Sequence, residues 1–190
     1  MENKETKFKA GFIAIVGPPN AGKSTLLNRM LGEKISITSK KPQTTRNRIL
    51  GVLHRPGAQL VFMDTPGIHA ASRPLNVRIV DQAIGAIGDC DLALFMVDAS
   101  TPMEAAEALL LKKIKTVSTP VILALNKTDL VPKEAVLLQL DKWKNEHEFA
   151  DMVPISAARG TQVDRLVAIM ESFLPENPPF FPEDALTDMP

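Results

Sequence analysis

Residues 17–24 read G-P-P-N-A-G-K-S and match the pattern G-x-x-x-x-G-K-[ST], which decides the fold. Residues 11–16, just before it, are apolar and rich in strand-forming types. Residues 22–31 carry apolar side chains at helical spacing and stop at Gly32. The sequence therefore predicts a strand, a tight loop and a helix. Such a loop turns backbone N–H groups toward an anion at a helix N-terminus, so we expect it to hold phosphate rather than to be an ordinary glycine-rich turn.

The residues of this loop have separable expected roles. Lys23 would bring positive charge to the outer phosphates, and the Ser24 hydroxyl would ligate Mg²⁺. Pro18 and Pro19 lack a backbone N–H, so they fit positions that donate nothing, and they would stiffen the loop. The predicted phosphate-binding residues are Gly17, Pro18, Pro19, Asn20, Ala21, Gly22, Lys23, Ser24 and Thr25.

The rest of the chain alternates strands and helices. We expect strands at 11–16, 47–53, 60–63, 91–97, 120–125 and 151–155, and helices at 22–31, 75–87, 104–117, 133–147 and 162–174. Near-continuously apolar strands are typical of a sheet covered on both faces, so the fold class is α/β, with a mostly parallel six-stranded sheet and helices on both faces. Ligands bind such sheets beyond the carboxyl ends of the strands, where each polar motif falls.

Bulk composition is that of an ordinary globular chain. It has 190 residues, a formal net charge of zero and a single cysteine, Cys90, which we expect to be a small hydrophobe at a helix end and not a nucleophile. The N-terminus lacks the apolar core of a secretory signal, and no apolar run reaches the ~18 residues of a membrane span. We expect a cytoplasmic protein with one domain over 1–175. Residues 176–190 are proline-rich and predict a linker or tail.

Two further motifs would complete the phosphate and metal end of the site. D-T-P-G at 64–67 contributes Asp64, Thr65, Pro66 and Gly67, followed by Ile68. Asp64 would hold Mg²⁺ through water, and the Gly67 N–H would meet a terminal phosphate; a plain turn is the alternative. The hydrophobic Ile68 cannot orient an attacking water, and we name no general base.

A threonine in the loop K-K-P-Q-T-T-R-N-R at 40–48 would close onto Mg²⁺. We favour Thr45 over Thr44, against the alternative of a basic solvated loop.

N-K-T-D at 126–129 follows an apolar strand and predicts base recognition. A guanine edge presents N1–H and N2–H₂ donors, and the Asp129 carboxylate can accept both. Adenine would leave Asp129 facing an acceptor, which a buried site penalises strongly. Asn126 can reach base and loop, and the Lys127 stem can pack along the base beside Thr128; a helix cap or Asx turn is the alternative.

S-A-A at 156–158 follows the last strand. Backbone N–H groups of Ser156, Ala157 and Ala158 can meet the guanine carbonyl. Trp143, on the helix after the base motif, is expected to pack in the core.

Together these motifs resemble a known family. G-P-P-N-A-G-K-S, Q-T-T-R, D-T-P-G, N-K-T-D and S-A-A, in that order, resemble the five motifs of translation-factor-class GTPases, in the branch that holds Era, MnmE and Der. K-I-S-I-T-S-K-K-P-Q-T-T-R and the tail F-P-E-D-A-L-T-D-M-P are most similar to the Era family of bacterial ribosome-assembly GTPases. The resemblance implies a P-loop NTPase with a Ras-like G domain that binds GTP and GDP with Mg²⁺ and hydrolyses GTP slowly.

The resemblance also implies partners and catalytic roles. Lys23, Thr45, Gly67 and Asn20 would be the catalytic set, with Asn20 helping to hold a K⁺ ion that supplies the charge of an arginine finger. Era-like proteins bind the small ribosomal subunit and its rRNA through a KH domain that would follow residue 190, so we expect RNA binding by this chain alone to be weak or absent. The family weakly implies peripheral membrane association.

Three other interpretations stay open. An ATP-dependent kinase or ATPase would share the phosphate loop but has no use for N-K-T-D. A non-catalytic module would bind nucleotide structurally and contact a partner through F-F-P-E-D. Another member of the same branch is the last; absence of a second motif set argues against Der, and an N-terminal G domain argues against MnmE.

Overall fold

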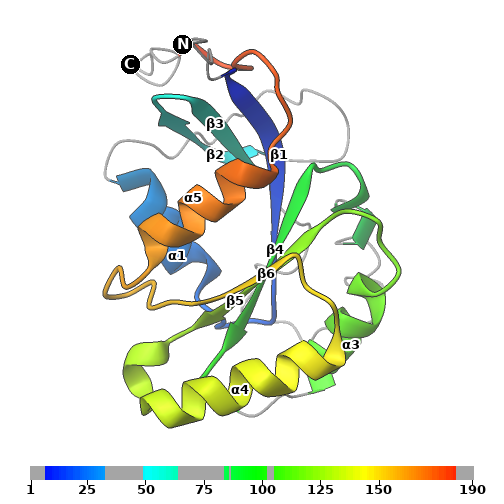
Figure 1. Cartoon of the computed structure of the whole chain (residues 1–190), viewed down its shortest axis with the longest axis vertical. Helices are drawn as coiled ribbons and strands as arrows, with labels where there is room; N and C mark the ends of the chain where they lie inside the picture. Colours follow the sequence, from blue (N-terminus) through cyan, green and yellow to red (C-terminus); the bar gives the residue numbers. More distant parts are fainter. Residues whose placement is uncertain (1–6, 33–48, 64–83, 86, 102–104, 183–190) are drawn as a thin grey trace, which may run out of the picture.

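The computed structural model describes residues 7–32, 49–63, 84–85, 87–101 and 105–182 (Figure 1). Several predicted features lie outside these residues. They are Thr44, Thr45, the D-T-P-G motif with Ile68, and most of the helix expected at 75–87.

The described part contains a six-stranded sheet in the order β2-β3-β1-β4-β5-β6. Its strands are β1 (Lys9–Val16), β2 (Ile49–Arg55), β3 (Ala58–Met63), β4 (Leu92–Asp98), β5 (Val121–Asn126) and β6 (Asp151–Pro154). Every neighbouring pair is parallel except β2 with β3, which form an antiparallel hairpin. The predicted α/β class and mostly parallel sheet are confirmed.

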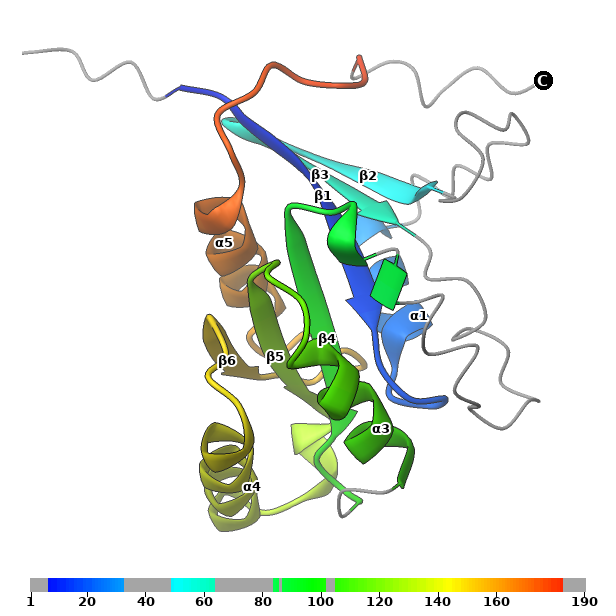
Figure 2. The same ribbon diagram turned by 90° about the vertical axis from the view of Figure 1, so that its right-hand side faces the viewer.

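Helices cover both faces of this sheet. They are α1 (Lys23–Leu31), α3 (Ala105–Ile114), α4 (Lys133–Glu146) and α5 (Val163–Phe173), with a short 3₁₀ turn, η2 (Thr128–Leu130). Buried side chains of α1 and α5 share one core cluster with Ile13 and Leu94. Buried side chains of α3 and α4 share a second core cluster with Phe95 and Leu123 on the opposite face. The arrangement of the helices in Figures 1 and 2 agrees with this division. Neighbouring strand residues thus alternate between two cores, which is why these strands are apolar throughout.

The second core confirms two expectations. Trp143 is 2% exposed and packs edge to face on Phe95, with ring centroids 5.6 Å apart, so it is a core residue. Burial, with Asp91 and Asp89 nearby, raises the pKa of the Cys90 thiol to about 12, which argues against a nucleophilic role. No helix within the described residues is long and apolar enough to cross a membrane.

Residues 175–182, after α5, are held against the amino end of β1 and against β3 (Figures 1 and 2). The fully buried Gln59 accepts hydrogen bonds from the backbone N–H groups of Phe180 (2.7 Å) and Phe181 (3.1 Å) and donates to the Phe181 carbonyl (2.7 Å). Phe180 also stacks on Phe12, with centroids 4.8 Å apart. This part of the expected linker is therefore packed, and the boundary at residue 175 stays a prediction.

Candidate functional site

The described motifs meet at one edge of the sheet. The phosphate loop follows β1, Asn126 ends β5, and Ser156 lies just after β6. These three strands are parallel to β4, so their carboxyl ends face the same way. The expectation that segments far apart in the sequence converge there is confirmed.

The phosphate loop adopts a backbone that few residue types tolerate. Asn20 has φ of 65° and Gly22 has φ of 97°, both left-handed. A Cβ on Gly17 would come 2.4 Å from the Met96 carbonyl oxygen of β4, so the loop starts against the sheet with no room for a side chain. Pro18 and Pro19 lie half-buried in the loop, where their missing N–H groups cost nothing.

Lys23, the first residue of α1, folds back over this loop. Its ammonium donates to the carbonyls of Gly17 (2.8 Å) and Pro18 (2.7 Å), and the residue is 5% exposed. Burial lowers the pKa of the Lys23 ammonium to about 8, because no anion among the described residues compensates its lost hydration. A phosphate in the loop would supply that compensation, so the site is electrostatically suited to an anion.

Asn126 joins the phosphate loop to the S-A-A loop. Its amide nitrogen donates to the Ala21 carbonyl (2.8 Å), and its amide oxygen accepts from the Ala157 N–H (2.9 Å). Asn126 is 2% exposed, so both bonds are sheltered from water. A Cβ on Gly22 would come 2.2 Å from the same amide nitrogen. One buried side chain therefore fixes the distance between the two parts of the site.

Asp129, the last residue of the N-K-T-D motif, is also bonded to the S-A-A loop. Its carboxylate accepts from the Ser156 hydroxyl (2.6 Å) and from the Arg159 guanidinium (3.4 Å). The Ser156 hydrogen bond, aided by Arg159, holds the pKa of the Asp129 carboxyl below its usual range. Asp129 is therefore an ionised acceptor at neutral pH, as recognition of two N–H donors requires.

Lys127 is positioned by a residue that the motif search missed. Lys127 has φ of 63°, and its ammonium pairs with the Asp98 carboxylate (2.5 Å) at the end of β4. Burial would raise the pKa of the Asp98 carboxyl, but hydrogen bonds from Lys127 and Ser100 outweigh it and lower that pKa. Thr128 donates to the Ile155 carbonyl through both its N–H (3.2 Å) and its hydroxyl (2.9 Å). The base motif is thus fixed to β4 and to the end of β6.

The metal end of the site lies partly outside the described residues. Ser24 and Thr25 expose their side chains in the first turn of α1, and a hydroxyl oxygen is a ligand that Mg²⁺ accepts. Thr45 and Asp64 fall outside the described part of the chain, which itself contains no group of three acidic, histidine or cysteine side chains able to hold a metal. Ser24 fits the predicted role, and the rest of the ligand set stays a prediction.

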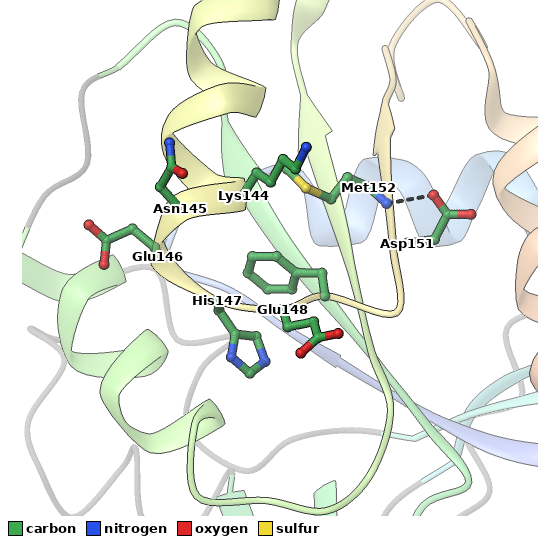
Figure 3. Close-up of a pocket in the computed structure, with 8 residues that line it drawn as sticks. Lys144, Asn145, Glu146, His147, Glu148, Asp151 and Met152 are labelled. Carbon is green, nitrogen blue, oxygen red and sulfur yellow. Dashed lines mark hydrogen bonds between the residues drawn. The ribbon is translucent and has the colours of Figure 1, made fainter.

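A surface hollow of about 660 Å³ lies away from this edge (Figure 3). It is lined by residues 144–149, which end α4 and follow it, and by Asp151 and Met152 at the start of β6. The hollow therefore lies where β6 begins, at the amino ends of the parallel strands. It contains none of the predicted site residues.

This fold and this edge define the class: a P-loop G domain of the Ras-like type. The family model described as "50S ribosome-binding GTPase" matches residues 12–127, and the chain belongs to that family.

Relatives narrow the resemblance to the Era branch. GTPase Era of Geotalea uraniireducens is 49% identical over 186 residues, which are 98% of this chain and 63% of that protein. A crystal structure of Era with MgGDPNP and nucleotides 1506–1542 of 16S ribosomal RNA is 42% identical, with a TM-score of 0.78 over 96% of this chain and 63% of that one. An Aquifex aeolicus Era variant bound to GDP and AlF₄⁻ has a TM-score of 0.76 and the same identity, 42%. The chain thus spans less than two thirds, 63%, of the length of these relatives.

Proposed function

We propose that this chain is the GTP-binding and slowly GTP-hydrolysing domain of an Era-like ribosome-assembly switch. The observation that carries the proposal is the Asp129 carboxylate, which Ser156 and Arg159 keep ionised. Asn126, in the same N-K-T-D motif, bonds the Ala21 carbonyl and so links this carboxylate to the phosphate loop. A carboxylate facing a guanine edge accepts both N1–H and N2–H₂, whereas an adenine edge offers it an acceptor. An adenine-nucleotide enzyme would gain nothing from this arrangement.

The phosphate end supports hydrolysis by positioning and charge. Lys23 is a buried cation bonded to the loop, and it would leave the Gly17 and Pro18 carbonyls for the phosphates. Ser24 would ligate Mg²⁺, which neutralises charge on the phosphates. Asn20 is exposed on the loop in a left-handed conformation, and this placement supports a role in holding K⁺.

The partner we propose is the small ribosomal subunit. The family description names the 50S subunit, whereas the Era relative was crystallised with 16S rRNA, an RNA of the small subunit. We follow the closer sequence match and propose that the RNA contact is made mainly by a KH domain beyond residue 190. A cytoplasmic location, with peripheral membrane association, is part of the same proposal.

Single-turnover hydrolysis of GTP tests the enzymatic part. Wild type should convert GTP to GDP and phosphate with Mg²⁺, faster in KCl than in NaCl, and Asn20→Ala should remove the difference between the two salts. Equal rates in both salts for the wild type would refute the K⁺ role. Tight GTP binding with no turnover in either salt would refute the enzyme and favour a non-catalytic binding module.

A further inference from the structure

Arg29, on the exposed side of α1, is hydrogen-bonded to the S-A-A loop, which lies 128 residues further along the sequence. Its Nε donates to the Ala157 carbonyl (2.6 Å), and its Nη2 donates to the Ala158 carbonyl. A planar guanidinium that donates to two successive carbonyls fixes the orientation of both peptide groups.

One of these two peptide groups contains the backbone N–H of the S-A-A loop that remains able to bond a ligand. Three of the four N–H groups at 156–159 are already used: Ser156 donates to the Thr161 carbonyl, Ala157 to Asn126, and Arg159 to the Ser156 hydroxyl. The Ala158 N–H has no acceptor within the described residues. It belongs to the same planar trans peptide as the Ala157 carbonyl, so the two groups point in opposite directions. By holding that carbonyl, Arg29 aims the Ala158 N–H away from α1.

The loop is shaped to admit this guanidinium. Gly160 has φ of 80°, and a Cβ there would come 3.0 Å from Arg29 Nη1. Any larger residue at 160 would therefore be strained and would press on the guanidinium. An arginine whose side chain merely extended from α1 into water would need neither this gap nor two backbone acceptors.

We propose that Arg29 is a positioning residue for base selection, which orients the S-A-A loop so that its free N–H faces the 6-oxo group of the guanine ring. This inference rests on the proposed function, because it presupposes a guanine between Asp129 and the loop. Arg29 touches no nucleotide in this account. It acts through the Ala157–Ala158 peptide, and because it is part of α1 it also ties the base loop to the phosphate helix.

Binding of three related purine nucleoside diphosphates, with ADP as the adenine reference, tests the proposal. GDP presents both the 6-oxo and 2-amino groups, the 2-aminopurine analogue lacks the 6-oxo group together with the N1–H, and IDP lacks the 2-amino group that Asp129 would read. The loss of N1–H affects every variant alike, so the effect of Arg29 is the change in preference between variants. Affinities are compared for wild type, Arg29→Met, Arg29→Lys and the control Arg165→Met. Arg165 is a suitable control because it is an arginine near the same loop, on α5, that within the described residues bonds only the Gln162 side chain.

The expected result is a selective loss. Arg29→Met should reduce the preference for GDP over the 2-aminopurine analogue about tenfold and leave the preference for GDP over IDP unchanged. Arg29→Lys, with a single donor group, should fall between Arg29→Met and wild type, and Arg165→Met should match wild type. A general loss of folding would lower all three affinities together, and if Arg29→Met fails to fold, Arg29→Lys carries the test.

Two outcomes would overturn the inference in different ways. If wild type prefers GDP over ADP but neither Arg29 variant changes the 6-oxo preference, the positioning role is wrong and the proposed function stands. If wild type does not discriminate GDP from ADP, the proposed function is wrong and the role of Arg29 in guanine selection falls with it.

Discussion

Adding one methyl group at Gly22 should separate the phosphate loop from the base loop. In Gly22→Ala, the new Cβ would meet the Asn126 amide nitrogen at 2.2 Å, well inside contact distance. Asn126 must then move, and it cannot keep its bonds to the Ala21 carbonyl (2.8 Å) and the Ala157 N–H (2.9 Å). Each such bond contributes about 1 kcal/mol net, so about 2 kcal/mol, or roughly 30-fold in GDP affinity, should be lost.

The same substitution also strains the backbone, and a matched glycine isolates that effect. Gly22 has φ of 97° and Gly32, at the other end of α1, has φ of 67°, but a Cβ on Gly32 would meet no atom of the described residues within 4 Å. Gly32→Ala should therefore cost about 1–2 kcal/mol of unfolding free energy without changing GDP affinity. Titration with fluorescent GDP and urea unfolding measure the two quantities. Wild-type GDP affinity in Gly22→Ala would refute the coupling through Asn126.

Three further outcomes are expected. Asp129→Asn should weaken GDP binding at least about 100-fold and improve binding of xanthosine diphosphate, whose 2-oxo group suits an amide donor; unchanged preference in a competition assay would refute the base assignment. Burial lowers the folded-state pKa of Lys23 from 10.5 to about 8, so the unfolded chain holds more protons between those values. The unfolding free energy of the nucleotide-free protein, relative to that of Lys23→Met, should therefore rise by about 2 kcal/mol from about pH 7.5 to about pH 9.5. Urea unfolding measures it at each pH, and the same pH dependence in both proteins would contradict this. Gln59→Leu should cost about 2–4 kcal/mol of unfolding free energy and speed proteolytic cleavage within residues 175–182, because it removes the bonds that hold Phe180 and Phe181; wild-type proteolysis would contradict that role.

The sequence predicts the sheet well because local burial controls it. Residues 92–97 and 121–125 are apolar throughout, and the structure places their side chains in cores on both faces. β1 is longer than the predicted 11–16, beginning at Lys9, because Lys9 and Ala10 pair with Ala58 and Gln59 of β3. That partner is remote in the sequence and leaves no local pattern at residues 9 and 10.

The site is predictable where a residue type is required by its own loop, and less so where it is required by a distant one. Lys23, Asn126 and Asp129 lie within motifs and fall at the expected edge of the sheet. Asp98 and Arg29 have no motif of their own, since each is specified by a contact with a loop distant in the sequence. An acidic residue at a strand end is the one local signal that could have found Asp98.

Packing of the segment after α5 was missed for the same physical reason. Its prolines exclude a helix but do not exclude an extended chain bonded to a buried side chain such as Gln59. His54 of β2 is half-buried beside the same side chain, with Nδ1 3.2 Å from the Gln59 amide nitrogen. A polar residue buried in a strand is visible in the sequence, whereas the partner that satisfies it is not.

Competition for bound fluorescent GDP by GTP, GDP and ATP, with Mg²⁺ present, tests the central claim most directly. The account predicts displacement by GTP and GDP at low concentration and none by ATP at about a thousandfold higher concentration, since Asp129 would face an acceptor on adenine. Displacement by ATP as effective as that by GTP would contradict the assignment of the base site. It would instead favour the interpretation of the chain as an ATP-dependent kinase or ATPase.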